Sequence, residues 1–237
     1  MSYRKPVYLL AGGRSTNRET IVRLIQAVFI SCEIVSPTIA YVGTANDDDE
    51  GFFNRIAEVF GEAGAYRVSH ALISSRKSDP KKAQQILKAA DIVFISGGDV
   101  YRGMCTLRRK NMTEFLSELC ERGKPFFGSS AGTIMLAKKW VRWLDPAVSS
   151  TAELFPCLGI APIICDTHDE RDGWQELKTI LRLGEDNTQG YGITTGAAIK
   201  VFPDGRIEAF GDAIHQFVRR GQRVYRGPDI LPICNSH

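Results

Sequence analysis

The sequence predicts an α/β protein with three αβα layers, in which a mostly parallel sheet carries helices on both faces. Over the first two-thirds of the chain, short apolar runs typical of strands buried on both faces alternate with segments of helical periodicity. This alternation implies right-handed crossovers between parallel strands. Past residue 137, short strand-like runs follow one another closely, which predicts antiparallel hairpins at the sheet edge.

Five strands are predicted in the first part of the chain, and the first of them is a short, continuous apolar run. They lie at residues 6–11, 38–43, 66–73, 91–96 and 125–128. Asn17 is predicted to cap the first helix, because apolar residues recur at helical spacing after it. A second helix is predicted at about 52–60. The third begins at the cap Ser78-Asp79-Pro80 and runs to residue 90, and helical segments then continue to about residue 122.

The rest of the chain predicts a strand at 160–165, a helix at 174–183 and then four short strands. Those strands lie at 191–194, 197–202, 206–210 and 215–220, and a turn at 203–205 joins two of them. We find no linker, repeat or low-complexity stretch in the sequence, so we expect residues 1–237 to form a single domain.

Composition narrows the functional class. The chain has 237 residues, of which 43% are hydrophobic and 24% charged, and its net charge is +3, which gives no case for nucleic-acid binding. We find no apolar run of the roughly 20 residues that a membrane helix needs, and the N-terminus does not resemble a secretory signal. The six cysteines show no CxxC pair, which favours reduced thiols. We expect a cytoplasmic protein without a membrane or nucleic-acid partner, and the sequence allows a homodimer.

The stretch GSSAG, from Gly128 to Gly132, matches the pattern Gly-x-Ser-x-Gly between a predicted strand and a helix. In this position the pattern predicts a nucleophile elbow with Ser130 as the exposed nucleophile. The helix that follows would point its free N–H groups at the site and help to hold an oxyanion. The alternative interpretation is a glycine-rich turn in which a serine caps the helix.

A serine nucleophile needs a base, and His168 is the histidine placed to supply one. It lies in a loop after a predicted strand, at the carboxyl end where the elbow also lies. The other histidines fall in a predicted strand, in the C-terminal hairpins and at the last residue. His168 follows Ser130 by only 38 residues, a spacing that disfavours an ordinary α/β-hydrolase esterase.

Four segments together resemble the serine peptidase family that includes dipeptidase E (aspartyl dipeptidase) and cyanophycinase. The resemblance covers roughly residues 7–217, and its order and spacing are more specific than any single motif. It rests on ADIVFISGGDVYR at 90–102, GSSAGTIML at 128–136, LFPCLGIAPIICDTHDE at 154–170 and YGITTGAAIKVFPDGRIEAFG at 191–211. It implies a fold similar to class I glutamine amidotransferases, with serine in place of their cysteine.

The resemblance also implies roles for individual residues. Ser130 matches the family nucleophile and His168 its general base, while the backbone N–H groups of Gly98 and Ala131 would form the oxyanion hole. The orienting acid is open. Asp145 matches the position of the aspartate in dipeptidase E, and loop acids such as Glu153 or Asp166 are alternatives, as is a dyad without an acid. The acids that cyanophycinase-like members carry in a GIDE stretch are replaced here by Thr194 and Thr195.

The substrates of the family need a cation to hold a carboxylate. The candidates for substrate binding are the arginines Arg102, Arg171 and Arg14, together with Asp99. The loop after His168 is acidic, which would repel an acidic substrate and favour a basic or neutral one. The cluster NDDDE at 46–50 is interpreted as a solvated, helix-capping run rather than a cation site.

These inferences predict a serine-type peptidase that hydrolyses small peptides without a metal or organic cofactor. Two alternatives stay open. The first is a non-catalytic ligand-binding or regulatory member of the amidotransferase-like fold, which the replaced acids favour. The second is an esterase or amidase that acts on a non-peptide substrate.

Overall fold

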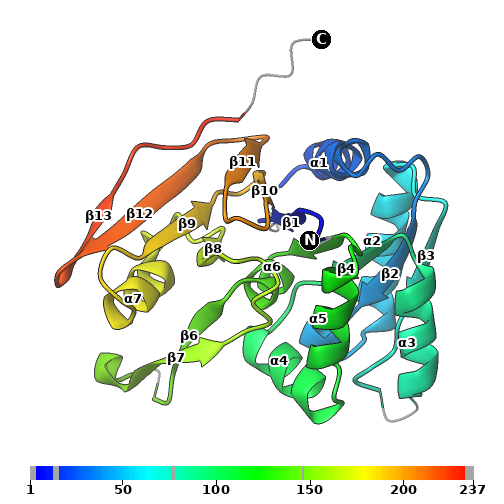
Figure 1. Cartoon of the computed structure of the whole chain (residues 1–237), viewed down its shortest axis with the longest axis horizontal. Helices are drawn as coiled ribbons and strands as arrows, with labels where there is room; N and C mark the ends of the chain where they lie inside the picture. Colours follow the sequence, from blue (N-terminus) through cyan, green and yellow to red (C-terminus); the bar gives the residue numbers. More distant parts are fainter. Residues whose placement is uncertain (1–3, 13–15, 76–77, 146, 233–237) are drawn as a thin grey trace.

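The computed structural model describes residues 4–12, 16–75, 78–145 and 147–232, and a seven-stranded sheet lies at its centre (Figure 1). The strand order is β11-β10-β1-β5-β4-β2-β3. In chain order these strands are β1 (Val7–Leu10), β2 (Thr38–Val42), β3 (Arg67–His70), β4 (Ile92–Ile95), β5 (Phe126–Ser129), β10 (Ala198–Val201) and β11 (Ile207–Phe210). The first five run parallel, whereas β10 is antiparallel to both β1 and β11.

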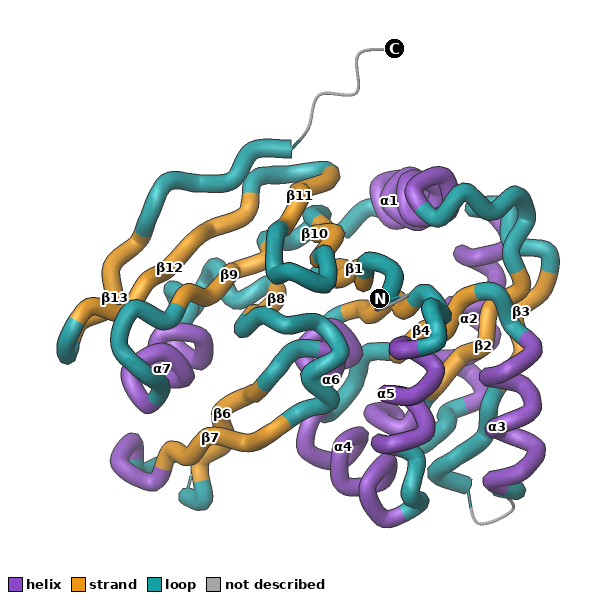
Figure 2. Tube along the Cα trace, viewed as in Figure 1, coloured by secondary structure: helices purple, strands orange, loops and turns teal. Residues whose placement is uncertain are grey.

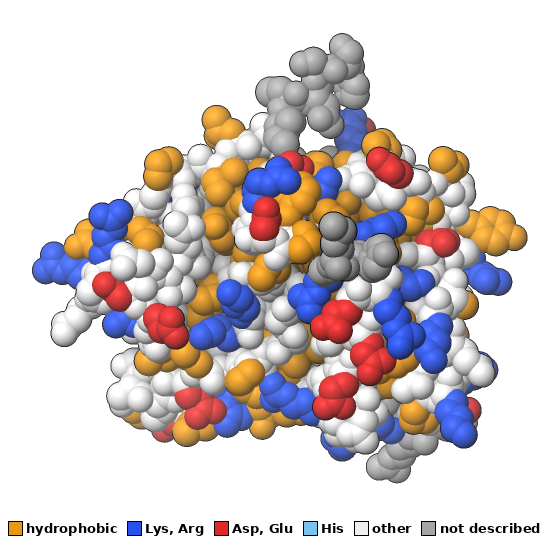
Figure 3. All heavy atoms as spheres, in the orientation of Figure 1, with side chains coloured by type: hydrophobic (Ala, Val, Ile, Leu, Met, Phe, Trp, Pro, Cys, Tyr) orange, Lys and Arg blue, Asp and Glu red, His pale blue; other side chains and the backbone are white. Residues whose placement is uncertain are grey.

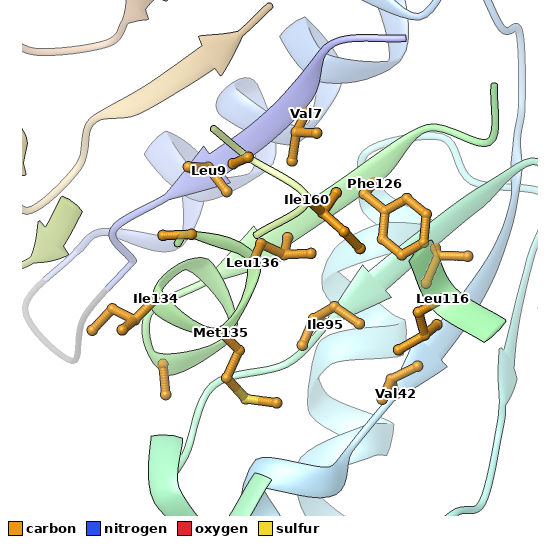
Figure 4. Packing of buried hydrophobic residues seen from close by; sticks show 14 of the residues in the cluster. Val7, Leu9, Val42, Ile95, Leu116, Phe126, Ile134, Met135, Leu136 and Ile160 are labelled. Atoms are coloured by element: carbon orange, nitrogen blue, oxygen red, sulfur yellow. The ribbon is translucent and has the colours of Figure 1, made fainter. Parts of the chain in front are cut away.

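Helices cover both faces of this sheet, because successive strand side chains point to opposite sides. On β1, Tyr8 and Leu10 pack into the cluster with α1 (Arg18–Ser31) and α2 (Glu50–Glu62). Val7 and Leu9 pack into the other cluster (Figure 4), which the opposite helices complete. Those helices are α3 (Pro80–Ala89), α4 (Val100–Arg109), α5 (Thr113–Glu121) and α6 (Ala131–Leu136). The predicted three-layer fold class is confirmed.

A second group of elements lies beside the central sheet, at the left in Figures 1 and 2. It contains a four-stranded sheet of order β13-β12-β9-β8 and a separate β6–β7 hairpin. The bounds are β6 (Lys139–Trp143), β7 (Ala152–Pro156), β8 (Cys165–Thr167), β9 (Gln189–Ile193), β12 (Ile214–Arg220) and β13 (Arg223–Arg226). Helix α7 (Gln175–Leu183) packs Leu177, Ile180 and Leu181 against both β-structures, around Trp174 and Phe217.

The predicted elements differ from the structure in three places. The strand predicted at 160–165 is wrong for its first part, since regular pairing begins only at Cys165. Before it, Ala161 N donates to Leu136 O at the end of α6 at 2.9 Å, and Ile163 O accepts from Lys138 N at 2.9 Å. The β6–β7 hairpin and β13 were not predicted. Of the C-terminal hairpins, β10 and β11 lie at the edge of the central sheet, and β9 and β12 belong to the second sheet.

The helix caps agree with the sequence. The Asn17 side chain accepts a hydrogen bond from Glu19 N, and Asp79 accepts from Lys81 N with Pro80 at the start of α3. Among the described residues, no helix is long and apolar enough to cross a membrane. Figure 3 shows basic and acidic side chains interspersed over the face in view. The single domain stays a prediction.

Candidate active site

Ser130 occupies a sharp turn between β5 and α6. Its backbone has φ 53° and ψ −123°, a conformation that costs energy for a residue with a side chain. Ser130 N donates to Leu10 O at 2.9 Å, which ties the turn to the end of β1. Glycine is required at Gly132, where a Cβ atom would lie 2.0 Å from Ile95 O. The GSSAG pattern therefore forms the strained strand-to-helix turn that an elbow requires.

The His168 ring reaches Ser130 from a different sheet. The Ser130 Oγ and His168 Nε2 atoms lie 2.7 Å apart, within hydrogen-bonding distance. His168 directly follows β8, and its N–H donates to Ile193 O at 3.0 Å. A neutral imidazole protonated at Nδ1 would accept the serine proton at Nε2. The structure thus brings together the two residues that the sequence assigned as nucleophile and base.

The two residues predicted to supply the oxyanion hole, Gly98 and Ala131, lie in turns next to Ser130. Ala131 is the first residue of α6, where helix N–H groups have no acceptor within the helix. Gly98 has φ 146°, and a Cβ atom there would lie 2.1 Å from Ala45 O. Gly97 lies against the nucleophile, since its own Cβ would be 3.2 Å from the Ser130 Cβ. Both residues predicted for the oxyanion hole therefore come from turns that meet at Ser130.

Asn46 supports the Gly97-Gly98 turn from behind, a role that the sequence analysis missed. Its Nδ2 donates to Gly97 O at 2.9 Å, and the same group lies 3.0 Å from the Tyr41 hydroxyl and 3.2 Å from Ser96 Oγ. The Gly97 carbonyl and the Gly98 N–H belong to one planar peptide and point in opposite directions. Holding the carbonyl therefore fixes the direction of the N–H. The sequence did indicate that Asn46 lies near the site, because Asn46 follows β2 at the carboxyl edge of the sheet.

The three aspartates of the NDDDE cluster have structural partners. Asp47 pairs with Arg102, and the Asp49 side chain caps α2 by accepting from Phe52 N. Asp48 is buried, and its Oδ2 accepts from the backbone N–H groups of residues 73–75. Among the described residues, no group of three or more His, Cys, Asp or Glu side chains is arranged to hold a metal ion.

The structure does not bring the three proposed orienting acids to His168. Asp145 lies in the turn after β6, where its Oδ1 accepts from Ala147 N at 3.0 Å. Glu153 Oε1 accepts from Arg142 Nε at 2.5 Å on the β6–β7 hairpin. Asp166 is buried on β8 and accepts from the N–H of its neighbour, Thr167. Within the described part of the chain, none of these carboxylates is hydrogen-bonded to His168.

Burial also sets the charge of Asp166. Loss of solvent raises the pKa of its carboxyl to about 8, and the nearby Glu176 and Asp169 carboxylates act in the same direction. Its Oδ2 atom has no hydrogen-bond partner. A carboxyl that is largely protonated at neutral pH is a poor candidate for stabilising an imidazolium ion.

A cavity of about 850 Å³ opens at Ser130 and contains a carboxylate that the sequence analysis had not assigned a role in the site. Glu170 lines this cavity together with Ser130 and His168. Its carboxylate accepts hydrogen bonds from the Thr195 N–H and, at 3.4 Å, from Thr195 Oγ1. The sequence held one indication that Glu170 belongs to the site, because Glu170 follows the predicted base, His168, by two residues.

The proposed substrate-binding residues divide into two groups. Arg171 lines the cavity. Arg102 does not, and its Nη1 instead pairs with Asp47 Oδ2 at 2.6 Å. The Asp99 side chain caps α4 by accepting from Arg102 N at 2.7 Å. Arg14, the remaining candidate, lies outside the described residues.

Comparison with known proteins identifies the family of this chain. The sequence model of the family described as Peptidase family S51 matches residues 7–208, which is most of the chain. The chain belongs to peptidase family S51. This membership confirms the resemblance predicted from the four segments, and it agrees with the predicted class of enzyme.

Individual relatives agree with the assignment to family S51. Peptidase E from Streptomyces coelicolor is 33% identical over 82 residues, a match that covers 35% of this chain and spans about a third (33%) of the relative's length. Among solved structures, a peptidase from an acI-B1 Actinobacterium has a TM-score of 0.72 at 17% identity, covering 96% of this chain and 97% of that chain. A putative peptidase E protein from Listeria monocytogenes has a TM-score of 0.65 at 15% identity, covering 88% and 98%. At these identities the structural matches support the shared fold.

Proposed function

We propose that this member of family S51 is a serine peptidase that hydrolyses small peptides at Ser130. The observation that carries the proposal is the 2.7 Å contact between Ser130 Oγ and His168 Nε2, two residues that line the same cavity. The elbow conformation of Ser130 and the flanking N–H groups of Gly98 and Ala131 support it.

The geometry suggests a two-stage reaction. Ser130 Oγ attacks the carbonyl carbon of the peptide while His168 Nε2 takes the hydroxyl proton. The N–H groups of Gly98 and Ala131 hold the oxyanion of the tetrahedral intermediate. His168 then returns the proton to the departing amine as the C–N bond breaks, which leaves an ester on Ser130. Water, deprotonated by His168, attacks that ester, releases the acid product and restores both residues.

Asp145, the acid that the resemblance favoured, accepts a hydrogen bond within its own turn after β6. We therefore propose that Ser130 and His168 act as a dyad. A dyad can work with reduced turnover, since the loss of an orienting acid costs about 10⁴ in kcat in serine proteases.

The test is hydrolysis of a panel of dipeptides by the wild-type protein and by Ser130→Ala. We expect the wild type to cleave at least one dipeptide and the variant to lose that activity while keeping its Tm. A folded wild type that cleaves no peptide but binds them would favour the non-catalytic alternative. Faster cleavage of an ester than of the matching peptide would favour the esterase alternative.

We also propose a cytoplasmic location, which the cysteines support. Each of the five described cysteines, namely Cys32, Cys105, Cys120, Cys157 and Cys165, is free rather than paired in a disulfide. A homodimer is a further proposal, and light scattering of the purified protein would test it.

A further inference from the structure

The cavity at Ser130 has two chemically different sides. One side, here called the apolar wall, is formed by the ends of β1 and β4 together with α1 and α2; its residues are Leu10, Ile21, Phe52, Ile56 and Phe94. The other side is polar and carries His168, Glu170, Arg171 and Thr195. Ser130 lines the same cavity, directly after β5, so a peptide bound at Ser130 has both kinds of surface within the cavity.

The apolar wall is the edge of the apolar cluster beneath α1 and α2, and part of this edge is exposed to the cavity. Leu10 and Phe94 are buried members of the cluster beneath α1 and α2, and they form its floor. Ile21, Phe52 and Ile56 pack against that cluster but remain partly accessible from the cavity. Apolar surface at the bottom of a small-molecule cavity is the usual contact for an apolar group of the ligand.

The wall is poorly suited to an acidic side chain. Of the described residues that line the cavity, Arg171 is the one arginine or lysine, and it belongs to the loop on the polar side. Arg102, the other described candidate, is held by Asp47 at 2.6 Å. A carboxylate placed against the apolar wall would lose its hydration without gaining an ion pair from the described residues of that wall, which is costly.

Glu170 provides a charge that suits the other end of a short peptide. Two hydrogen bonds from Thr195 fix its carboxylate at the cavity. A fixed carboxylate there complements the α-ammonium group of a peptide with a free N-terminus. The volume of about 850 Å³ falls in the range of small-ligand pockets, which fits a peptide of a few residues.

We propose that the site selects short peptides that have a free N-terminus and a large apolar side chain beside the scissile bond. The apolar wall takes the side chain, and the Glu170 carboxylate takes the α-ammonium group. This inference rests on the proposed peptidase function and deepens it by naming the substrate class.

The test compares kcat/KM for Leu-Ala, Ala-Leu, Ala-Ala, Asp-Ala and N-acetyl-Leu-Ala. We expect the better of the two leucine peptides to exceed Ala-Ala by about 10-fold or more, as large apolar pockets commonly discriminate. Asp-Ala should be the poorest of the free dipeptides, and acetylation should lower kcat/KM about 10-fold. In Glu170→Gln the penalty for acetylation should largely disappear.

A matched pair of variants on α1 tests the wall itself. Ile21 lines the cavity, whereas Ile30 is on the same helix with 78% of its surface exposed. We expect Ile21→Lys to lower kcat/KM for the preferred leucine peptide about 10-fold and to improve Asp-Ala relative to it. Ile30→Lys should change neither. Thermal melts of both variants show whether they are folded. If Ile21→Lys does not fold, the dipeptide panel on the wild type decides whether the site selects apolar side chains.

The outcomes separate the two proposals. If the wild type cleaves dipeptides through Ser130 but prefers Asp-Ala, the apolar selection is overturned and the peptidase function stands. Equal cleavage of the free and acetylated leucine peptides overturns the role of Glu170. A folded wild type that cleaves no peptide overturns the peptidase function and this inference with it.

Discussion

The side-chain amide of Asn46 donates a hydrogen bond to the Gly97 carbonyl at 2.9 Å, on the side of the turn opposite to the Gly98 N–H. Because both groups belong to one peptide plane, Asn46 sets the direction in which the Gly98 N–H points. The same amide group also contacts Tyr41 and Ser96 at the ends of β2 and β4. The donor proposed for the oxyanion is therefore anchored to two strands of the sheet.

Replacing Asn46 should impair catalysis more than binding. We expect Asn46→Ala to lower kcat by about 10- to 100-fold with little change in KM, because a misaligned donor weakens contact with the transition state but not with the ground state. Steady-state kinetics on the best dipeptide measure both constants. Asn54→Ala, at an exposed position of α2, is the control and should behave as the wild type. A rise in KM with unchanged kcat would contradict this role.

The hairpin aspartate provides a second prediction. Asp145 satisfies its carboxylate within its own turn, through Ala147 N at 3.0 Å. We therefore expect Asp145→Asn to keep kcat/KM within about twofold of the wild-type value, since removing an orienting acid would instead cost about 10⁴. The assay is dipeptide hydrolysis at saturating and low substrate concentration. A loss of that larger size would mean that the turn moves to His168 during the reaction.

Sequence patterns predicted the parts of the site that depend on local backbone. The elbow at Ser130 needs small residues at Gly128 and Gly132, and the five-residue motif GSSAG meets this requirement. His168 was found because the carboxyl ends of strands converge at one edge. Asn46 and Glu170 were missed because their roles depend on contacts with Gly97 and Thr195, which are distant in the sequence.

The same distinction holds for the fold. Strands β1, β2 and β4 were predicted because they are almost wholly buried and consist almost entirely of apolar residues. Strand β6 was not predicted because it combines charged and aromatic residues and is mostly half-buried. The apolar run at 160–164 was misleading, since most of its residues are buried although they belong to no strand, and Ala161 instead bonds to Leu136 at the end of α6. Apolar character predicts burial, but it does not identify the backbone partner.

The protonation of Asp166 predicts how stability depends on pH. An aspartate in the unfolded chain has a pKa near 4, whereas burial raises the pKa of Asp166 to about 8 in the folded protein. Folding therefore takes up a proton between these values, and the contribution of Asp166 to the free energy of unfolding falls as pH rises through this window. Above about pH 8 the carboxyl is ionised in both states, and its contribution changes no further.

We expect Asp166→Asn to flatten this dependence. Thermal melts at about pH 5.5 and about pH 8.5 should show a smaller loss of Tm for the variant than for the wild type, because the amide cannot ionise. Glu176 and Asp169, whose carboxyl pKa values burial also raises, should leave some dependence in both proteins. Glu114→Gln, at an exposed position of α5, should melt with the pH dependence of the wild type. Identical slopes for Asp166→Asn and wild type would refute the prediction.

The turn at Gly98 should tolerate no side chain. A Cβ atom at Gly98 would lie 2.1 Å from Ala45 O, so Gly98→Ala must displace either the turn or the loop after β2. Such a displacement moves the N–H that we propose as an oxyanion donor, and the loss of one donor of this kind costs about 100- to 1000-fold in kcat. We expect Gly98→Ala to lose activity on this scale in the dipeptide assay, together with a lower Tm.

Gly61→Ala is the matched control for the chemical change itself. A Cβ atom at Gly61, near the end of α2, would meet no atom within 4 Å. Alanine is favoured over glycine in a helix by about 0.5–1 kcal/mol, so this variant should keep full activity with an equal or higher Tm. If Gly98→Ala were as active as Gly61→Ala, the loop at Ala45 would have to move aside without any displacement of the Gly97-Gly98 turn. The Gly98 N–H could then not be a rigidly positioned oxyanion donor.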